Sequence, residues 1–125
     1  MKLKRSTEDY LKIIYILSRQ REVHGADIAE ELGVSRPTVS IALKALEGEG
    51  YITRDDSRAI CLTEEGLDIA KSTYERHQTF QTMLESLGVD HETAAADACL
   101  MEHAVSPESF RALKGLAEGA VNGCE

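Results

Sequence analysis

The residues Gly33-Val34-Ser35 constrain the fold most, because they leave only three residues between two helical patterns. Gly33 is suited to the end of a helix, and Ser35 is a favoured cap for the next helix, which has Pro37 in its first turn. So short a connection makes two helices cross steeply. This is typical of a helix-turn-helix, whose second helix can enter a DNA major groove.

Hydrophobic patterns predict further elements on both sides of this turn. Apolar residues in STEDYLKIIYIL recur at helical spacing, and Ser6 or Thr7 can cap that helix. After the helix-turn-helix, YITRDDSRAICLT predicts a hairpin that turns at Asp55-Asp56-Ser57. Three more helices are predicted, from the cap Thr63 to about Leu87, over about 91–103, and from Ser106-Pro107 onward. The expected fold is mainly α, a winged helix-turn-helix followed by a helical region.

Charge is distributed unevenly along the chain. The net charge of −8 by itself disfavours binding to nucleic acid. Residues 1–72 hold 11 Lys or Arg and 13 Asp or Glu, whereas residues 73–125 hold 3 and 9. Most of the basic charge therefore lies in the first part, where a basic face can coexist with an acidic whole.

The second helix of the motif has a polar face opposite its apolar residues, where side chains suited to DNA gather. Basic side chains can bind phosphates or guanine edges, hydroxyls can donate to phosphates, and apolar groups can contact thymine methyls. Two further arginines flank the hairpin turn. The alternative is an ordinary solvated surface, which an exposed Ile41 fits poorly. The predicted DNA-binding residues are Ser35, Arg36, Pro37, Thr38, Ser40, Ile41, Lys44, Arg54 and Arg58.

A second cluster of chemically active side chains lies in DACLMEH, residues 97–103. Cys99, Glu102 and His103 fall at i, i+3 and i+4, so on a helix they share one face within one turn. Thiolate, carboxylate and imidazole are usual ligands of first-row transition metals. One helix supplies only one wall of a coordination sphere, so we expect further ligands from elsewhere, with Asp9 and His77 as the best candidates.

Other interpretations of these residues stay open at this point. Asp9 can complete a capping box with Ser6, His77 can be a surface histidine, and Cys99 can be a small buried apolar residue. One alternative function is a winged-helix regulator with a purely structural zinc or no metal. Another is a small hydrolase with Cys99 as nucleophile and His103 as base, although no oxyanion-hole loop is recognisable.

Cysteine usage and hydropathy bound the location of the protein. Cys61, Cys99 and Cys124 are an odd number at no regular spacing, which argues against a disulfide framework and allows a thiolate ligand. No apolar run approaches the ~18 residues of a membrane span, and MKLKRSTEDY is not followed by a signal-peptide stretch. We expect a cytoplasmic protein with no membrane association, no small-molecule substrate and no enzymatic activity.

Five segments together carry a resemblance to a known family. STEDYLKIIYIL, ADIAEELGVSRPTVSIALKALEGEGYI, LTEEGLDIA, RHQTF and DACLMEHAVS are similar, in order, to the diphtheria toxin repressor and manganese transport regulator family of metal-dependent repressors. The similarity covers about residues 6–115, and its DNA segment and its metal segment match together. It implies a winged-helix DNA-binding domain over 1–72 and a helical metal-binding and dimerisation domain over 73–125.

The resemblance also implies a cofactor and partners. Bound Fe(II) or Mn(II) would promote binding of a homodimer to operator DNA, and Zn(II), Co(II) or Ni(II) would also bind in vitro. By motif position the family's ligands correspond to Asp9, His77, Cys99, Glu102 and His103. Apolar residues left for a dimer interface are Phe80, Met83, Leu84, Leu87, Leu100, Phe110 and Leu113.

Three positions depart from the family pattern. Lys12 stands where the manganese branch has a carboxylate for a second metal, and Gln81 and Ala95 stand where the iron branch has ancillary ligands. The sequence therefore leaves open whether each subunit binds one metal or two. We also expect the SH3-like domain found at the C-terminus of longer members to be missing.

Overall fold

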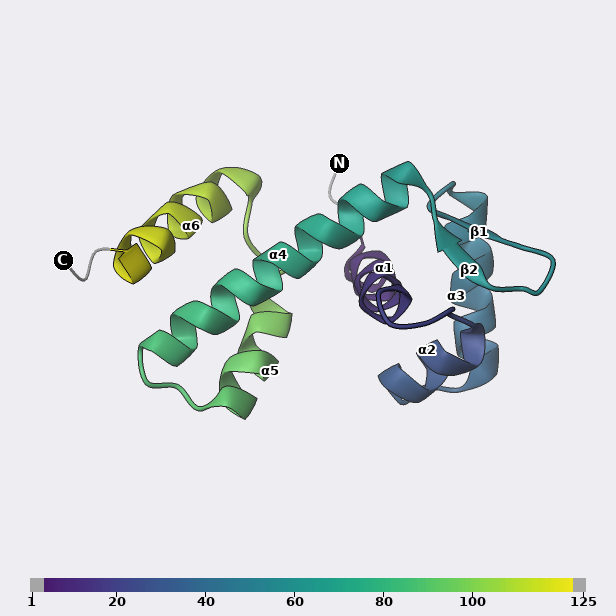
Figure 1. The fold of residues 1–125 in the computed structure, drawn as a ribbon, viewed down its shortest axis with the longest axis horizontal. Helices are drawn as coiled ribbons and strands as arrows, with labels where there is room; N and C mark the ends of the chain where they lie inside the picture. The colour runs from purple at the N-terminus through teal and green to yellow at the C-terminus, as the bar shows by residue number, and fades with distance from the viewer. Residues whose placement is uncertain (1–3, 123–125) are drawn as a thin grey trace. The chain divides into compact units, whose positions relative to one another are not determined.

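The computed structural model describes residues 4–122 and divides the chain into two compact units, with the boundary between Ser72 and Thr73. Within the described residues, no helix is long and apolar enough to cross a membrane. The elements, labelled in Figure 1, are α1 (Arg5–Ser18), α2 (Gly25–Leu32), α3 (Arg36–Gly48), β1 (Ile52–Arg54), β2 (Ile60–Leu62), α4 (Glu64–Ser86), α5 (His91–Met101) and α6 (Pro107–Asn122).

The first unit is a winged helix-turn-helix built on one continuous apolar core. The helical spacing predicted for α1, α2 and α3 places one side of each helix in that core, and the strands contribute one residue each. The core residues are Tyr10, Leu11, Ile14, Leu17, Val23, Ile28, Ala29, Val39, Leu43, Leu46, Ile52, Ile60 and Ala70. This confirms the predicted mainly α fold and its apolar helix faces.

The turn between α2 and α3 forms as its residue types predict. Gly33 adopts a left-handed conformation with φ of 67°, and its N–H donates to the carbonyl of Ala29. The Ser35 hydroxyl then accepts a hydrogen bond from the N–H of Thr38 at 3.3 Å, which caps α3. Local chemistry therefore ends one helix and begins the next within three residues.

The predicted hairpin is present and is tied to the core of the first unit. β1 and β2 pair antiparallel with Thr53 opposite Cys61, and they lie beside α3 in Figure 1. The N–H of Ile60 donates to the carbonyl of Val23 at 2.8 Å, which joins the hairpin to the segment before α2. The hairpin is thus tied to the first unit at the pair of residues next to its turn, and residues 55–59 form the tip of the wing.

A close backbone approach fixes the start of α4. The predicted cap Thr63 accepts from the N–H of Gly66 at 3.1 Å and donates to the carbonyl of Gly50 at 2.7 Å. A Cβ on Gly66 would lie 2.0 Å from the carbonyl oxygen of Tyr51. Glycine is therefore required here for space, a need that the sequence did not reveal.

The predicted cap of α1 was wrong. The helix begins at Arg5, with Lys4 as the N-cap and no side-chain cap hydrogen bond, so Ser6 and Thr7 lie inside the first turn. Thr7 is buried instead of capping. Asp9 is paired with Arg5 at 3.8 Å, and a capping box with Ser6 does not form.

The second unit has a small aromatic core. Phe80 of α4, Ala98 of α5 and Phe110 of α6 form its buried apolar cluster. The two phenyl rings meet edge to face with centroids 5.7 Å apart. Partly buried residues around them are Met83, Met101, Val105 and Leu113.

This core corrects part of the predicted dimer surface. Phe80 is 0% and Phe110 is 7% exposed, so both rings are used inside the unit and are not free for a partner. Leu87 and Leu100 are 78% and 55% exposed, as an interface would require. The sequence pattern could not distinguish the two groups, because the burial of an apolar side chain depends on what packs against its helix.

Candidate metal centre and nucleic-acid interface

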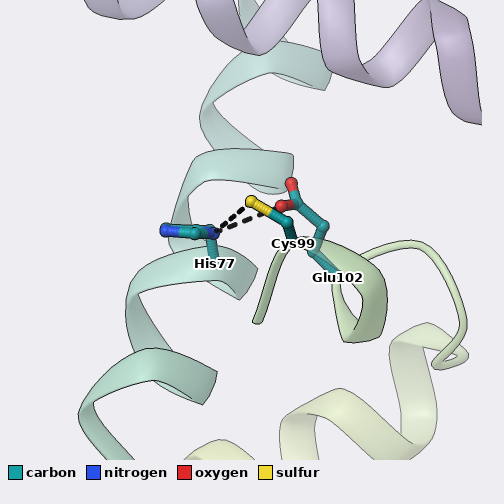
Figure 2. Close-up of side chains that lie close together, drawn as sticks. All are labelled: His77, Cys99 and Glu102. Carbon is teal, nitrogen blue, oxygen red and sulfur yellow. Dashed lines mark hydrogen bonds and ion pairs between the residues drawn. The ribbon is translucent and has the colours of Figure 1, made fainter. Parts of the chain in front are cut away.

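Three predicted ligands meet in the second unit. His77 lies on α4, Cys99 lies on α5, and Glu102 follows directly as the C-cap of α5. Figure 2 shows their side chains pointing toward one another. The Cys99 Sγ is 3.7 Å from the His77 Nδ1, and the Glu102 Oε1 is 3.3 Å from the same nitrogen. One ligand atom from each residue lies within 4.8 Å of the others.

These separations fit one metal ion. Metal–sulfur and metal–nitrogen bonds of about 2.3 and 2.0–2.1 Å at a tetrahedral angle place the two ligand atoms about 3.6 Å apart. The same reasoning gives about 3.4 Å between nitrogen and carboxylate oxygen. The observed 3.7 and 3.3 Å agree with both values. The set of nitrogen, sulfur and oxygen donors is one that first-row transition metals accept.

Glu102 is the most buried member of this cluster. Its carboxylate is 0% exposed and presents Oε1 to His77 and Oε2 to His103, the latter 4.0 Å from Nε2. A buried carboxylate needs a cation or several hydrogen bonds to offset its lost hydration. His77 is only 16% exposed, so it is not a surface histidine.

The predicted helix over 91–103 is too long. α5 ends at Met101, Glu102 is its αR cap, and His103 lies in the turn beyond. Glu102 keeps a helical backbone conformation, and its N–H donates to the carbonyl of Ala98 at 3.0 Å, so Cys99 and Glu102 stay on one helical turn as predicted. Only His103 lies beyond the helix.

Asp9 and the residues that depart from the family pattern lie on α1, α4 and α5. Asp9 is on α1 in the first unit, and its role as a ligand stays a prediction. Lys12, also on α1, is only 6% exposed. Gln81 donates to Glu85 at 3.0 Å and lies 3.3 Å from His91, on the exposed surface of the second unit. Ala95 on α5 offers no donor atom.

Arg76 was missed by sequence reasoning, although it precedes His77. Its guanidinium donates a hydrogen bond to the carbonyl of Val105 and lies over the Phe110 ring, 5.1 Å from the centroid. Val105 is two residues after His103, so this contact fastens the turn that carries two candidate ligands. No local pattern could indicate a bond between residues 29 positions apart.

The predicted DNA-binding residues gather in the first unit, on α3 and the wing. Arg36, Pro37, Ser40 and Lys44 are exposed, as expected. Ile41 is 72% exposed, a large apolar side chain left on a polar face. Such a residue is suited to contact with a thymine methyl.

Ser35 and Thr38 have a local task as well. Their hydroxyl oxygens lie 2.8 Å apart, and Ser35 also accepts from the Thr38 N–H. Both are exposed, so the cap and a contact with phosphate are compatible. Arg54 ends β1 and is half-buried, and Arg58 lies exposed after the wing turn with φ of 66°.

The comparisons with known proteins cover both units. Residues 2–60 match the family model described as iron dependent repressor, N-terminal DNA binding domain. Residues 63–118 match the one described as iron dependent repressor, metal binding and dimerisation domain. Between them the two matches take in the exposed face of α3, the wing and the cluster around Glu102.

Individual relatives agree with these matches. An uncharacterized HTH-type transcriptional regulator of Methanocaldococcus jannaschii is 35% identical over 115 residues, 90% of this chain and 92% of the relative. The transcriptional regulator MntR of Escherichia coli is 42% identical over 86% of this chain and 70% of its own. A manganese-dependent transcriptional repressor solved with manganese is 30% identical, with a TM-score of 0.80. That match covers 90% of this chain, which spans about half of the solved chain (52%).

Proposed function

Because this chain belongs to the iron-dependent repressor family, we propose that it is a metal-dependent transcriptional repressor that binds operator DNA. The observation that carries the proposal is the cluster of His77, Cys99 and Glu102, whose ligand atoms are spaced for one ion. The exposed face of α3 and the wing supply the DNA surface. The protein acts in the cytoplasm by binding and not by catalysis.

The cofactor of this repressor is Fe(II) or Mn(II), with Zn(II), Co(II) and Ni(II) as alternatives in vitro. His77, Cys99, Glu102 and His103 would hold it, and the family resemblance adds Asp9. Bound metal supplies positive charge that neutralises the buried Glu102 carboxylate and joins α4 to the end of α5. Asp9→Asn should weaken metal binding if that residue is a ligand and leave the affinity unchanged if it is not.

Metal acts as a switch only if it binds the DNA-competent arrangement more tightly than the free one. A coupling of about 1–3 kcal/mol, or 5–150-fold in DNA affinity, is usual for such linkage. The alternative is a structural zinc or no metal, in which case metal would leave DNA affinity unchanged.

The decisive experiment titrates metal into chelator-treated protein while operator binding is followed by fluorescence anisotropy. Operator duplexes are first selected from a random library with metal-loaded protein. We expect Fe(II) or Mn(II), handled without oxygen, to raise DNA affinity by the coupling above, and Glu102→Gln to abolish the response. Equal DNA affinity with and without metal would favour the structural-zinc alternative.

The repressor is proposed to bind as a homodimer. One winged helix offers few phosphate contacts, whereas two half-sites about 34 Å apart would supply enough for tight specific binding. The exposed Leu87 and Leu100 are suited to the interface. Sedimentation at micromolar concentration with metal should show a dimer, and Leu87→Glu should shift it toward monomer. A monomeric parent protein would refute this part.

The physiological metal is proposed to be Fe(II), with Mn(II) the weaker activator. A thiolate is softer than a carboxylate, and manganese favours oxygen-rich shells. A Cys99→Glu variant should therefore shift the ratio of Mn(II) to Fe(II) activation of DNA binding toward Mn(II). Identical ratios in parent and variant would show that Cys99 does not determine metal choice.

A further inference from the structure

An open hollow of about 320 Å³ lies in the first unit between the start of α2, α3 and the wing. Arg36 of α3, Arg54 of β1 and Arg58 of the wing turn all line it, together with the hydroxyl residues Ser40 and Ser57. No carboxylate is among its lining residues. In a chain with a net charge of −8, this is a local concentration of positive charge.

Arg54 is half-buried beside the hollow. Its Nε is buried and has no hydrogen-bond partner among the described residues. Buried donors are nearly always paired, because a lost hydrogen bond to water is costly. Neither Arg36 nor Arg58 takes part in an ion pair within the described part of the chain. An anion in the hollow would not reach this buried nitrogen, but it would offset the repulsion between the three like charges.

The wing turn is built to hold Arg58 in place. Asp55 Oδ1 accepts hydrogen bonds from the N–H and hydroxyl of Ser57 and from the N–H of Ala59, at 2.9, 2.7 and 2.9 Å. The N–H of Arg58 donates to the carbonyl of Asp55 at 2.9 Å. This network maintains the left-handed φ of Arg58, a conformation that non-glycine residues rarely adopt and that tends to occur at functional sites.

The chemistry of the lining favours a phosphate group. Guanidinium groups present planar pairs of N–H donors that match phosphate oxygens. Gly25 and Ala26, the first two residues of α2, also line the hollow, and the first N–H groups of a helix favour anions. A water molecule takes about 30 Å³ of liquid volume, so the space holds a phosphate and several waters.

We propose that this hollow binds a single phosphate group of the operator backbone, shared by Arg36, Arg54 and Arg58. The inference rests on the proposed DNA-binding function and deepens it by assigning Arg36. Arg36 binds the phosphate together with Arg54 and Arg58, and it does not contact a guanine edge. Base reading is left to the exposed residues farther along α3, of which Ser40, Ile41 and Lys44 are candidates.

The test uses metal-loaded, full-length protein and the salt dependence of its operator affinity. Each phosphate neutralised contributes a slope of about 0.9 in log K against log salt concentration. For a dimer with one hollow in each protomer, we expect the triple variant R36Q/R54Q/R58Q to lose about 1.8 in this slope, because the three residues of each protomer share one phosphate. Three separate phosphate contacts in each protomer would lose about 5.4. Arg111→Gln, an exposed arginine of α6, is the matched single-charge control for Arg54→Gln.

Two further measurements separate the possible ligands and roles. Replacing chloride with inorganic phosphate at constant ionic strength should weaken operator binding by the parent more than by Arg54→Gln. Arg36→Gln should weaken binding to operator and to a scrambled duplex by the same factor. Arg54→Lys keeps the positive charge but lacks the planar guanidinium. The weakening of its operator binding by phosphate should lie between the values for Arg54→Gln and the parent.

The outcomes distinguish the two proposals. A parent protein without metal-dependent operator binding would refute the proposed function itself. A parent that binds as proposed, with a triple-variant slope loss of about 5.4 for the dimer, would overturn the shared phosphate site alone. So would an Arg36→Gln variant that loses discrimination between operator and scrambled DNA. Unchanged unfolding midpoints in urea ensure that each variant is folded.

Discussion

The two units of the molecule are stabilised in different ways. The first has thirteen buried core residues drawn from three helices, the hairpin and the start of α4. The second has three buried apolar core residues among those described, beside a buried carboxylate and a buried imidazole. Burial of apolar area is the main driving force of folding. The first unit therefore has the larger apolar driving force, whereas the second also buries ionisable groups, whose lost hydration must be offset by polar partners.

This difference fits a protein whose first unit binds DNA with a fixed geometry and whose second unit responds to metal. A ligand stabilises the folded state that binds it. In a unit with a small apolar core, ligand binding therefore supplies a larger share of the free energy of folding. A DNA-reading helix must instead keep its geometry in both states. Four experiments, from the largest expected effect to the smallest, test this comparison.

Truncating a core side chain should cause the largest loss of stability, and added metal should offset that loss only in the second unit. Phe80→Ala should cost about 3–5 kcal/mol and Leu11→Ala about 2–5 kcal/mol, because each leaves a cavity in a fully buried site. Hydrogen exchange of each unit measures the loss. Added metal should offset part of the loss for Phe80→Ala and none for Leu11→Ala. Leu116→Ala, on a side chain that is 66% exposed, is the control.

Metal removal should affect the units unequally. A ligand at 100 times its Kd stabilises the state that binds it by about 2.7 kcal/mol. Chelation should therefore lower the hydrogen-exchange protection of α5 by about that amount, while α2 and α3 keep theirs. Equal losses in both units would contradict the division drawn here.

Removing Arg76 should weaken metal binding without removing a ligand. Arg76→Gln releases the Val105 carbonyl and the Phe110 ring, so the turn with Glu102 and His103 becomes less ordered. Outer partners of metal ligands typically contribute 10–100-fold in affinity, and we expect about 10-fold here. Isothermal titration with Mn(II) measures the change. Lys114→Gln, which loses only an exposed pair with Glu75, should bind like the parent.

Acid should loosen the start of α5 but not the start of α3. The Thr93 N–H donates to the Asp90 cap and lowers the pKa of that carboxyl below its ordinary value of 3.8. The cap contributes stability above the ordinary pKa, which is lost as pH falls through the lower folded value. Ser35 caps α3 without titrating in this range. Asp90→Asn should retain the cap and remove this pH dependence, as amide exchange near Thr93 would show.

Much of the first unit could be predicted because its signals are local. The turn at Gly33, the Ser35 cap and the apolar face of α3 each depend on residues within one or two helical turns of one another. The cap of α1 was also predicted from local signals, but that prediction was wrong. Ser6 and Thr7 were equally good local candidates, whereas the structure begins the helix at Arg5 and buries Thr7.

The sequence by itself determined the order of the elements and which chemical groups are present. A repeat of apolar residues every three or four positions predicts a helix, whatever that helix packs against. Cys99, Glu102 and His103 are so close in the sequence that they lie near one another in any fold. Only the tertiary structure decided which residues far apart in the sequence come into contact. His77 lies beside Cys99, Arg76 binds Val105, and Gly66 packs against the backbone of Tyr51. The tertiary structure also placed Arg36, Arg54 and Arg58 around one hollow and buried Phe80 in the core. These outcomes depend on how helices and strands pack, and packing has no periodicity that a single sequence displays.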